Sequence, residues 1–68
     1  MKINLDWKDK KNKAINCDEK LKVLNENFEE IKNVTQSAYD DAILMGCNDN
    51  DFKSKLILLI KNLKFSYK

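Results

Sequence analysis

The chain has 68 residues, of which 35% are charged and 43% hydrophobic, and a formal net charge of +2 at pH 7. This length allows one small domain, and this balance excludes both a disordered polar segment and a membrane protein. A single glycine, no proline, no histidine and only two cysteines exclude a turn-rich β-sandwich, a structural zinc site and a disulfide framework, so we expect one mainly α-helical domain over residues 1–68 with no cofactor or metal.

The first eight residues alternate strictly between apolar and polar side chains. The apolar members are Met1, Ile3, Leu5 and Trp7. A period of two residues is typical of a half-buried strand, so the sequence predicts an extended, strand-like segment over residues 1–8. Residues 9–16 are polar and have no periodicity, and they are predicted to form a linker.

Apolar residues then recur in alternating steps of three and four over residues 17–45. They are Leu21, Leu24, Phe28, Ile31, Ala38, Ala42 and Met45, with Thr35 as the polar member of the series. This spacing is the apolar stripe of an amphipathic helix, and the sequence predicts a helix over residues 17–45. Gly46 follows directly and is predicted to end it, because glycine adopts the left-handed conformation at little cost.

A turn over residues 46–50 and a second helix from residue 51 are predicted next. Phe52, Leu56, Leu59 and Leu63 continue the helical spacing. Because the connection is short, the two helices are expected to form an antiparallel hairpin. The end of the second helix stays open between residues 62 and 66, since alternation around Phe65 and Tyr67 also fits a short C-terminal strand, which would make the fold an α+β variant.

Residues 56–60 are five consecutive apolar residues. In a helix such a run covers the whole circumference, whereas one neighbouring helix covers only a stripe of it. Ile57, Leu58 and Ile60 lie outside the stripe that would face the first helix. Their cover is expected to come either from the N-terminal segment or from another protein chain.

The function predicted from this run is non-catalytic protein–protein interaction. The chain would act as a small adaptor, a chaperone subunit or an inhibitor that regulates a larger protein, and no enzymatic activity is expected. The residues predicted to contact a partner are Trp7, Phe52, Ile57, Leu58, Ile60, Phe65 and Tyr67. Aromatic residues in this set are the best candidates for the largest contributions to binding.

Charge is unevenly distributed and suggests an alternative. Residues 23–51 carry seven acidic residues and one lysine, whereas residues 52–68 carry five lysines and no acidic residue. In a hairpin, lysines of the second helix would pair with acidic residues of the first. In the alternative, two hairpins assemble into a four-helix dimer that binds nucleic acid through its lysines, although the lack of arginine disfavours recognition of bases.

The cellular location is inferred from the lengths of the apolar runs in the sequence. The longest of them, residues 56–60, is far shorter than the roughly 20 residues needed to cross a bilayer. Residues 1–13 contain no apolar run of signal-peptide length. The sequence therefore predicts a cytoplasmic protein with a protein partner or a second copy, and no membrane partner.

Overall fold

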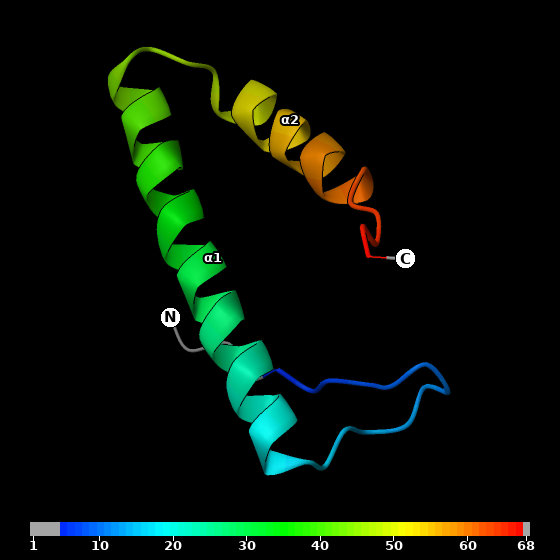
Figure 1. Cartoon of the computed structure of the whole chain (residues 1–68). Coiled ribbons are helices and arrows are strands. Elements are labelled where there is room, and N and C mark those ends of the chain that lie inside the picture. Colours follow the sequence, from blue (N-terminus) through cyan, green and yellow to red (C-terminus); the bar gives the residue numbers. More distant parts are fainter. Residues whose placement is uncertain (1–4, 68) are drawn as a thin grey trace. The chain divides into compact units, whose positions relative to one another are not determined.

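The computed structural model describes residues 5–67 and contains two α-helices (Figure 1). α1 spans Asp18–Leu44 and α2 spans Asp49–Lys61. The predicted mainly helical fold is confirmed, and no sheet occurs in the described part of the chain. The chain divides into two compact units, Met1–Val34 and Thr35–Lys68, and α1 contributes residues to both.

The segment before α1 folds back on itself instead of forming a strand followed by a linker. Lys8 and Ala14 form a single antiparallel bridge. The backbone N–H of Ile15 donates to the carbonyl of Trp7 over 2.9 Å. Residues 5–7 have no regular structure, and residues 1–4 of the predicted strand lie outside the described residues.

Asp9 organises the turn of this loop. Its carboxylate accepts hydrogen bonds from the backbone N–H groups of Lys11 and Lys13 over 2.9 and 3.0 Å. Asn12 has a φ of 65°, in the left-handed region that asparagine adopts more readily than most residues. A local side-chain-to-backbone network therefore shapes the predicted linker, and such networks leave no apolar periodicity.

Trp7 holds the loop against the first half of α1. Its ring meets Phe28 edge to face, with centroids 5.7 Å apart and an interplanar angle of 76°. Its Nε1–H donates to Oδ1 of Asn25 over 2.7 Å. Leu21, Leu24 and Phe28 are half-buried, as expected for the predicted stripe of α1.

The turn between the helices follows the predicted residue chemistry. Gly46 has a φ of +88°, and its N–H donates to the carbonyl of Ile43 over 3.0 Å. Asn48 caps α2 by accepting the N–H of Asp51 on its side chain over 2.9 Å. Because Asn48 is the cap, α2 begins at Asp49, two residues before the predicted start.

α2 packs on the second half of α1 near this turn and forms a two-helix hairpin. Phe52 meets Tyr39 edge to face, with centroids 5.6 Å apart. Ala42 is 6% exposed and is the one buried residue in the part of the chain that the structure describes. The hairpin is thus held by few side chains close to the turn.

α2 ends at Lys61, and Asn62 caps it, with its N–H directed at carbonyls of the last turn. Of the two predicted ends, the shorter one at residue 62 agrees with the structure. Residues 63–67 contain neither the helical extension nor the C-terminal strand. Neither α1 nor α2, over the described residues, has the length and apolar character needed to cross a membrane.

Candidate functional site

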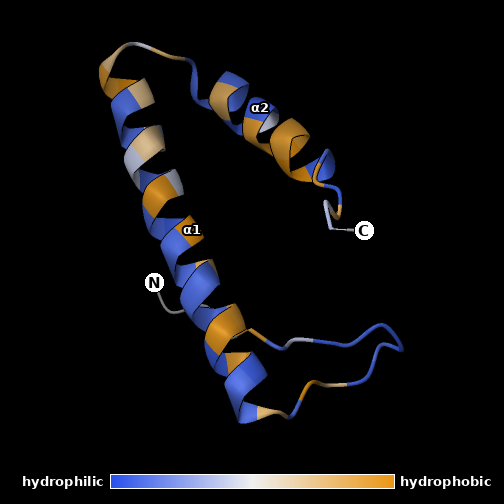
Figure 2. Ribbon diagram, viewed as in Figure 1, coloured by the Kyte–Doolittle hydropathy of each residue, from blue (hydrophilic) through white to orange (hydrophobic). Residues whose placement is uncertain are grey.

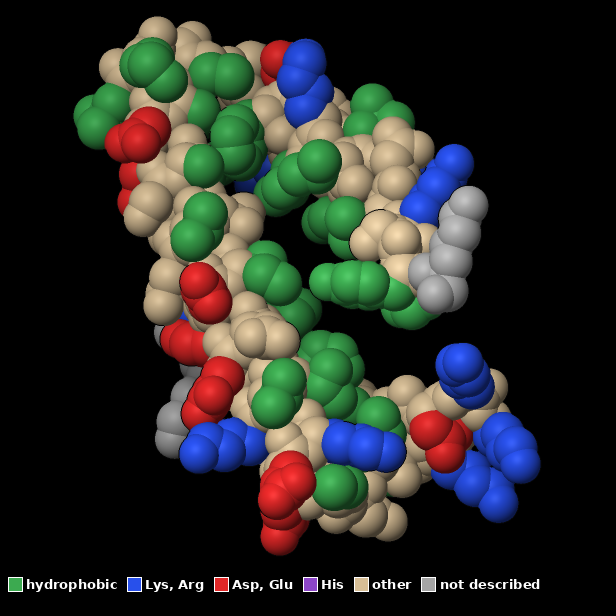
Figure 3. All heavy atoms as spheres, in the orientation of Figure 1, with side chains coloured by type: hydrophobic (Ala, Val, Ile, Leu, Met, Phe, Trp, Pro, Cys, Tyr) green, Lys and Arg blue, Asp and Glu red, His purple; other side chains and the backbone are tan. Residues whose placement is uncertain are grey.

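The second half of α2 is hydrophobic (Figure 2) and exposes large apolar side chains (Figure 3). The exposed fractions are 50% for Ile57, 59% for Leu58, 64% for Leu59 and 57% for Ile60. We call these four residues the α2 apolar surface. Leu59 was predicted to face the first helix, but α1 covers the stripe only as far as Leu56, which is half-buried.

The other predicted contact residues fall into two groups. Phe65 and Tyr67 are 87% and 79% exposed, and their rings lie 5.9 Å apart in the segment after α2. Trp7 and Phe52 are half-buried against aromatic rings of the same chain. The structure thus places Ile57, Leu58 and Ile60 on one helix, directly before the exposed aromatic pair, whereas Trp7 belongs to the N-terminal unit.

Ion pairs among the described residues form within a helix and not between helices. Nζ of Lys53 lies 3.1 Å from Asp49, and Nζ of Lys55 lies 2.6 Å from Asp51. The expectation that these lysines pair with acidic residues of the first helix is therefore wrong. A partner four residues earlier on the same helix is within reach without any tertiary contact, and this local pairing prevails.

Three apolar residues of α1 are exposed, and one of them, Ile31, belongs to the predicted stripe. Val23, Ile31 and Val34 are 55%, 58% and 65% exposed. At about 100° per residue they fall within an arc of about 80° on the helix. The expected covered stripe is therefore wrong at Ile31, and Val23 was not singled out from the sequence.

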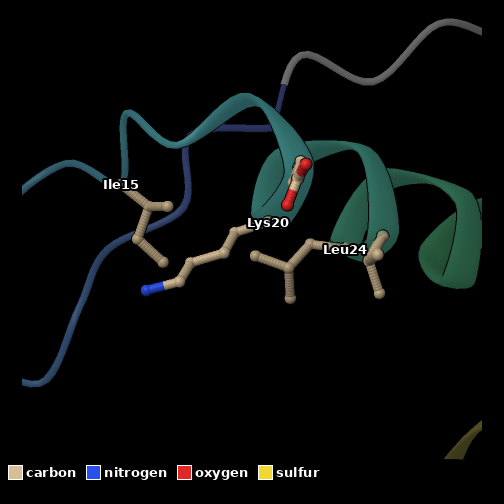
Figure 4. A pocket seen from close by; sticks show the side chains of 5 residues that line it. Ile15, Lys20 and Leu24 are labelled. Atoms are coloured by element: carbon tan, nitrogen blue, oxygen red, sulfur yellow. The ribbon is translucent and has the colours of Figure 1, made fainter.

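A hollow of about 470 Å³ lies where the N-terminal segment meets the first turns of α1. Figure 4 shows Ile15 approaching from that segment and Lys20 and Leu24 from the helix. Val23 and Glu19 complete the lining. The walls are mainly apolar, so the hollow suits an apolar side chain better than a polar ligand.

Tyr39, Asp49 and Lys53 form a polar cluster beside the Phe52 contact. The Tyr39 hydroxyl donates to Oδ1 of Asp49 over 2.7 Å, and Nζ of Lys53 lies 5.5 Å from the centre of the Tyr39 ring. Hydrogen bonds from Tyr39 and then from Lys53 lower the pKa of Asp49 from its ordinary 3.8. The bond to Asp49 raises the pKa of Tyr39 from its ordinary 10.0, because it stabilises the protonated phenol.

We expect this cluster to make the stability of the hairpin depend on pH. Asp49, with its lowered pKa, contributes stability above its unfolded-state pKa, and this is lost as pH falls through the folded-state value. Tyr39, with its raised pKa, contributes stability below pH 10.0, which is lost as pH rises through the folded-state value. We expect Tyr39→Phe to lower the unfolding temperature at neutral pH, and the difference from the unmodified chain to shrink below pH 3.8 and above pH 10.0.

Thermal unfolding followed by far-ultraviolet circular dichroism at a series of pH values measures this difference. Tyr67→Phe is the matched control, because Tyr67 is 79% exposed and lies after α2. A Tyr39→Phe difference that stays constant across the whole pH range would contradict the assigned coupling.

The two cysteines are free and exposed. Cys17 lies directly before α1, and the backbone N–H of Lys20 lowers the pKa of its thiol from the ordinary 9.0. Among the residues that the structure describes, no three potential metal ligands come together.

Comparisons with protein-family models, with curated proteins and with solved structures give no significant match, so the function is inferred from the chain's own residues.

Proposed function

We propose that this protein is a non-catalytic module that binds another protein through the α2 apolar surface. One observation carries the proposal: four consecutive apolar residues, 57–60, are each at least half exposed on a helix. Burial of apolar area contributes about 25 cal/mol per Å², so a matching surface on a partner would bind this face favourably. The class of function is that of a small adaptor, a chaperone subunit or an inhibitor of a larger protein.

The proposed contact is α2 packed against a complementary surface of the partner. Ile57, Leu58 and Ile60 would form the centre of this contact, and the exposed rings of Phe65 and Tyr67 would extend it beyond the helix end. Such aromatic rings often contribute most to binding. Phe52 and Trp7 would act indirectly, because each fastens part of its own unit through an aromatic contact.

Nucleic-acid binding is the second candidate, and the five lysines of residues 52–68 favour it. Two of them, Lys53 and Lys55, already pair with acidic residues of α2. The remaining lysines would give weak binding that falls steeply as salt concentration rises. We therefore expect no binding of a short DNA duplex at physiological salt, whereas salt-dependent binding of that duplex would support this candidate.

The main proposal is tested by the double variant Ile57→Asp/Ile60→Asp. The tagged chain is used to retain proteins from an extract of cells that produce it naturally, and a retained protein is then purified for titration. We expect the double variant to bind that protein about 100-fold more weakly, since two apolar contacts become desolvated charges. The matched control is Asn50→Asp/Ser54→Asp, which adds the same charge at exposed positions of α2.

Circular dichroism of both double variants tests whether each keeps its helices, as we expect for both. The control is expected to bind as the unmodified chain does. Equal affinity of all three proteins for the purified partner would show that the α2 apolar surface is not the binding site.

A further inference from the structure

Two exposed strips of residues on this chain carry opposite charges, and each contains two aliphatic side chains. On α1, Val23, Glu26, Glu30 and Val34 follow one another at steps of three, four and four, and we call them the acidic strip. At about 100° per residue they lie within an arc of about 80°. Val23 and Val34 are 55% and 65% exposed, and both glutamates are exposed.

On α2, Ile57 and Ile60 lie beside Lys61, and Lys64 follows in the irregular segment, three residues after the last residue of the helix. We call these four residues the basic strip. The isoleucines are 50% and 57% exposed, and both lysines are exposed. Over residues 5–67, neither lysine forms an ion pair.

We propose that the protein bound by the α2 apolar surface is a second copy of this chain, whose acidic strip receives the basic strip reciprocally. This inference rests on the proposed function and names its partner. The acidic strip has a valine at each end and two glutamates between them, the basic strip has two isoleucines followed by two lysines, and the two charges are opposite. The reciprocal arrangement forms the contact twice in one dimer.

Pairing of like strips is disfavoured. Two copies of α2 that met through their basic strips would bring Lys61 and Lys64 toward lysines of the other copy. Two acidic strips would likewise oppose Glu26 and Glu30 with glutamates. Like charges at a contact suppress wrong pairings, so charge selects the α1-to-α2 arrangement.

The dimer has a consequence for binding of any other protein. Because Ile57 and Ile60 serve both contacts, a different protein must displace the second copy before it binds α2. Its apparent affinity therefore falls as the concentration of this chain rises. Self-association would then keep the α2 apolar surface covered unless a protein that binds it more tightly is present.

The test is a charge exchange followed by sedimentation equilibrium. The mass measured for the unmodified chain is expected to rise with protein concentration, from 8.0 kDa toward twice that value. Lys61→Glu/Lys64→Glu and Glu26→Lys/Glu30→Lys are each expected to weaken self-association about tenfold or more, because every charged contact becomes repulsive. An equimolar mixture of these two variants is expected to recover it, since each acidic α2 then meets a basic α1 of the other variant.

Lys10→Glu/Lys11→Glu is the matched control, since both lysines are exposed in the N-terminal loop, and it should leave self-association unchanged. A mass of 8.0 kDa at every concentration, or a mixture that does not recover, would overturn the inference. A mass that keeps rising beyond the dimer would overturn reciprocal pairing. The proposed function is judged separately by the Ile57→Asp/Ile60→Asp titration with a purified partner: it can stand when self-association fails, whereas its own failure would overturn this inference as well.

Discussion

Replacing Ala42 with aspartate is expected to detach α2 from α1 and to abolish cooperative unfolding of the C-terminal unit. Ala42 is 6% exposed and lies one turn from Tyr39, which contacts Phe52. A carboxylate at this position would lose most of its hydration without gaining a cation. A buried unpaired charge costs several kcal/mol, which matches the roughly 3–5 kcal/mol that a core of this size supplies.

Nuclear Overhauser contacts between the Tyr39 and Phe52 rings report this detachment directly, and circular dichroism gives the unfolding temperature. Ser37→Asp is the matched control, because it adds the same charge at an exposed position of α1. We expect that control to keep the ring contacts and to change stability by about 0.5 kcal/mol or less. Equal unfolding temperatures for the two variants would show that Ala42 is not the centre of the hairpin contact.

Replacing Trp7 with alanine is expected to release the N-terminal loop from α1. The variant loses the edge-to-face contact with Phe28 and the hydrogen bond to Asn25. Since Trp7 is half-buried, removal of the ring costs about 2–3 kcal/mol from lost apolar burial and aromatic contact. Hydrogen exchange of the Ile15 amide, which bonds to the Trp7 carbonyl, should become at least about tenfold faster.

Trp7→Phe separates the two contributions, because phenylalanine retains an aromatic edge for Phe28 but has no N–H for Asn25. We expect it to produce a smaller increase in exchange than alanine does. If exchange at Ile15 is the same in all three proteins, the loop is held by the turn around Asp9 and not by the indole ring.

The helices were predictable because their signals are local. The spacing from Leu21 to Ala42 defines α1, and Gly46 and the Asn-rich turn mark the boundary with α2 within one or two residues. These features depend on side chains within a few positions of each other, which the sequence displays directly.

The packing between the helices was less predictable. The spacing of apolar residues shows which face of a helix meets its neighbour, but it does not show how far along the helix that contact extends. Leu59 shares the helical stripe of Phe52 and Leu56, yet it is 64% exposed because the hairpin contact is concentrated near the turn. Lys53 and Lys55 were expected to reach α1, but carboxylates four residues away on α2 engage them first. The loop around Asp9 gave no apolar signal, since hydrogen bonds shape it.

The candidate site was predictable in part. The argument that one helix cannot cover five consecutive apolar residues agrees with the exposure of Ile57, Leu58 and Ile60. The identity of what covers them stays a prediction.

The aromatic contacts also give each unit its own optical reporter. Trp7 is the single tryptophan of the chain, and it lies against Phe28 in the N-terminal unit. Tyr39 lies against Phe52 in the C-terminal unit. Fluorescence emission from the indole therefore follows the N-terminal end of the helix without any attached dye, and in the Trp7→Phe variant the near-ultraviolet signal of the tyrosines follows the C-terminal end.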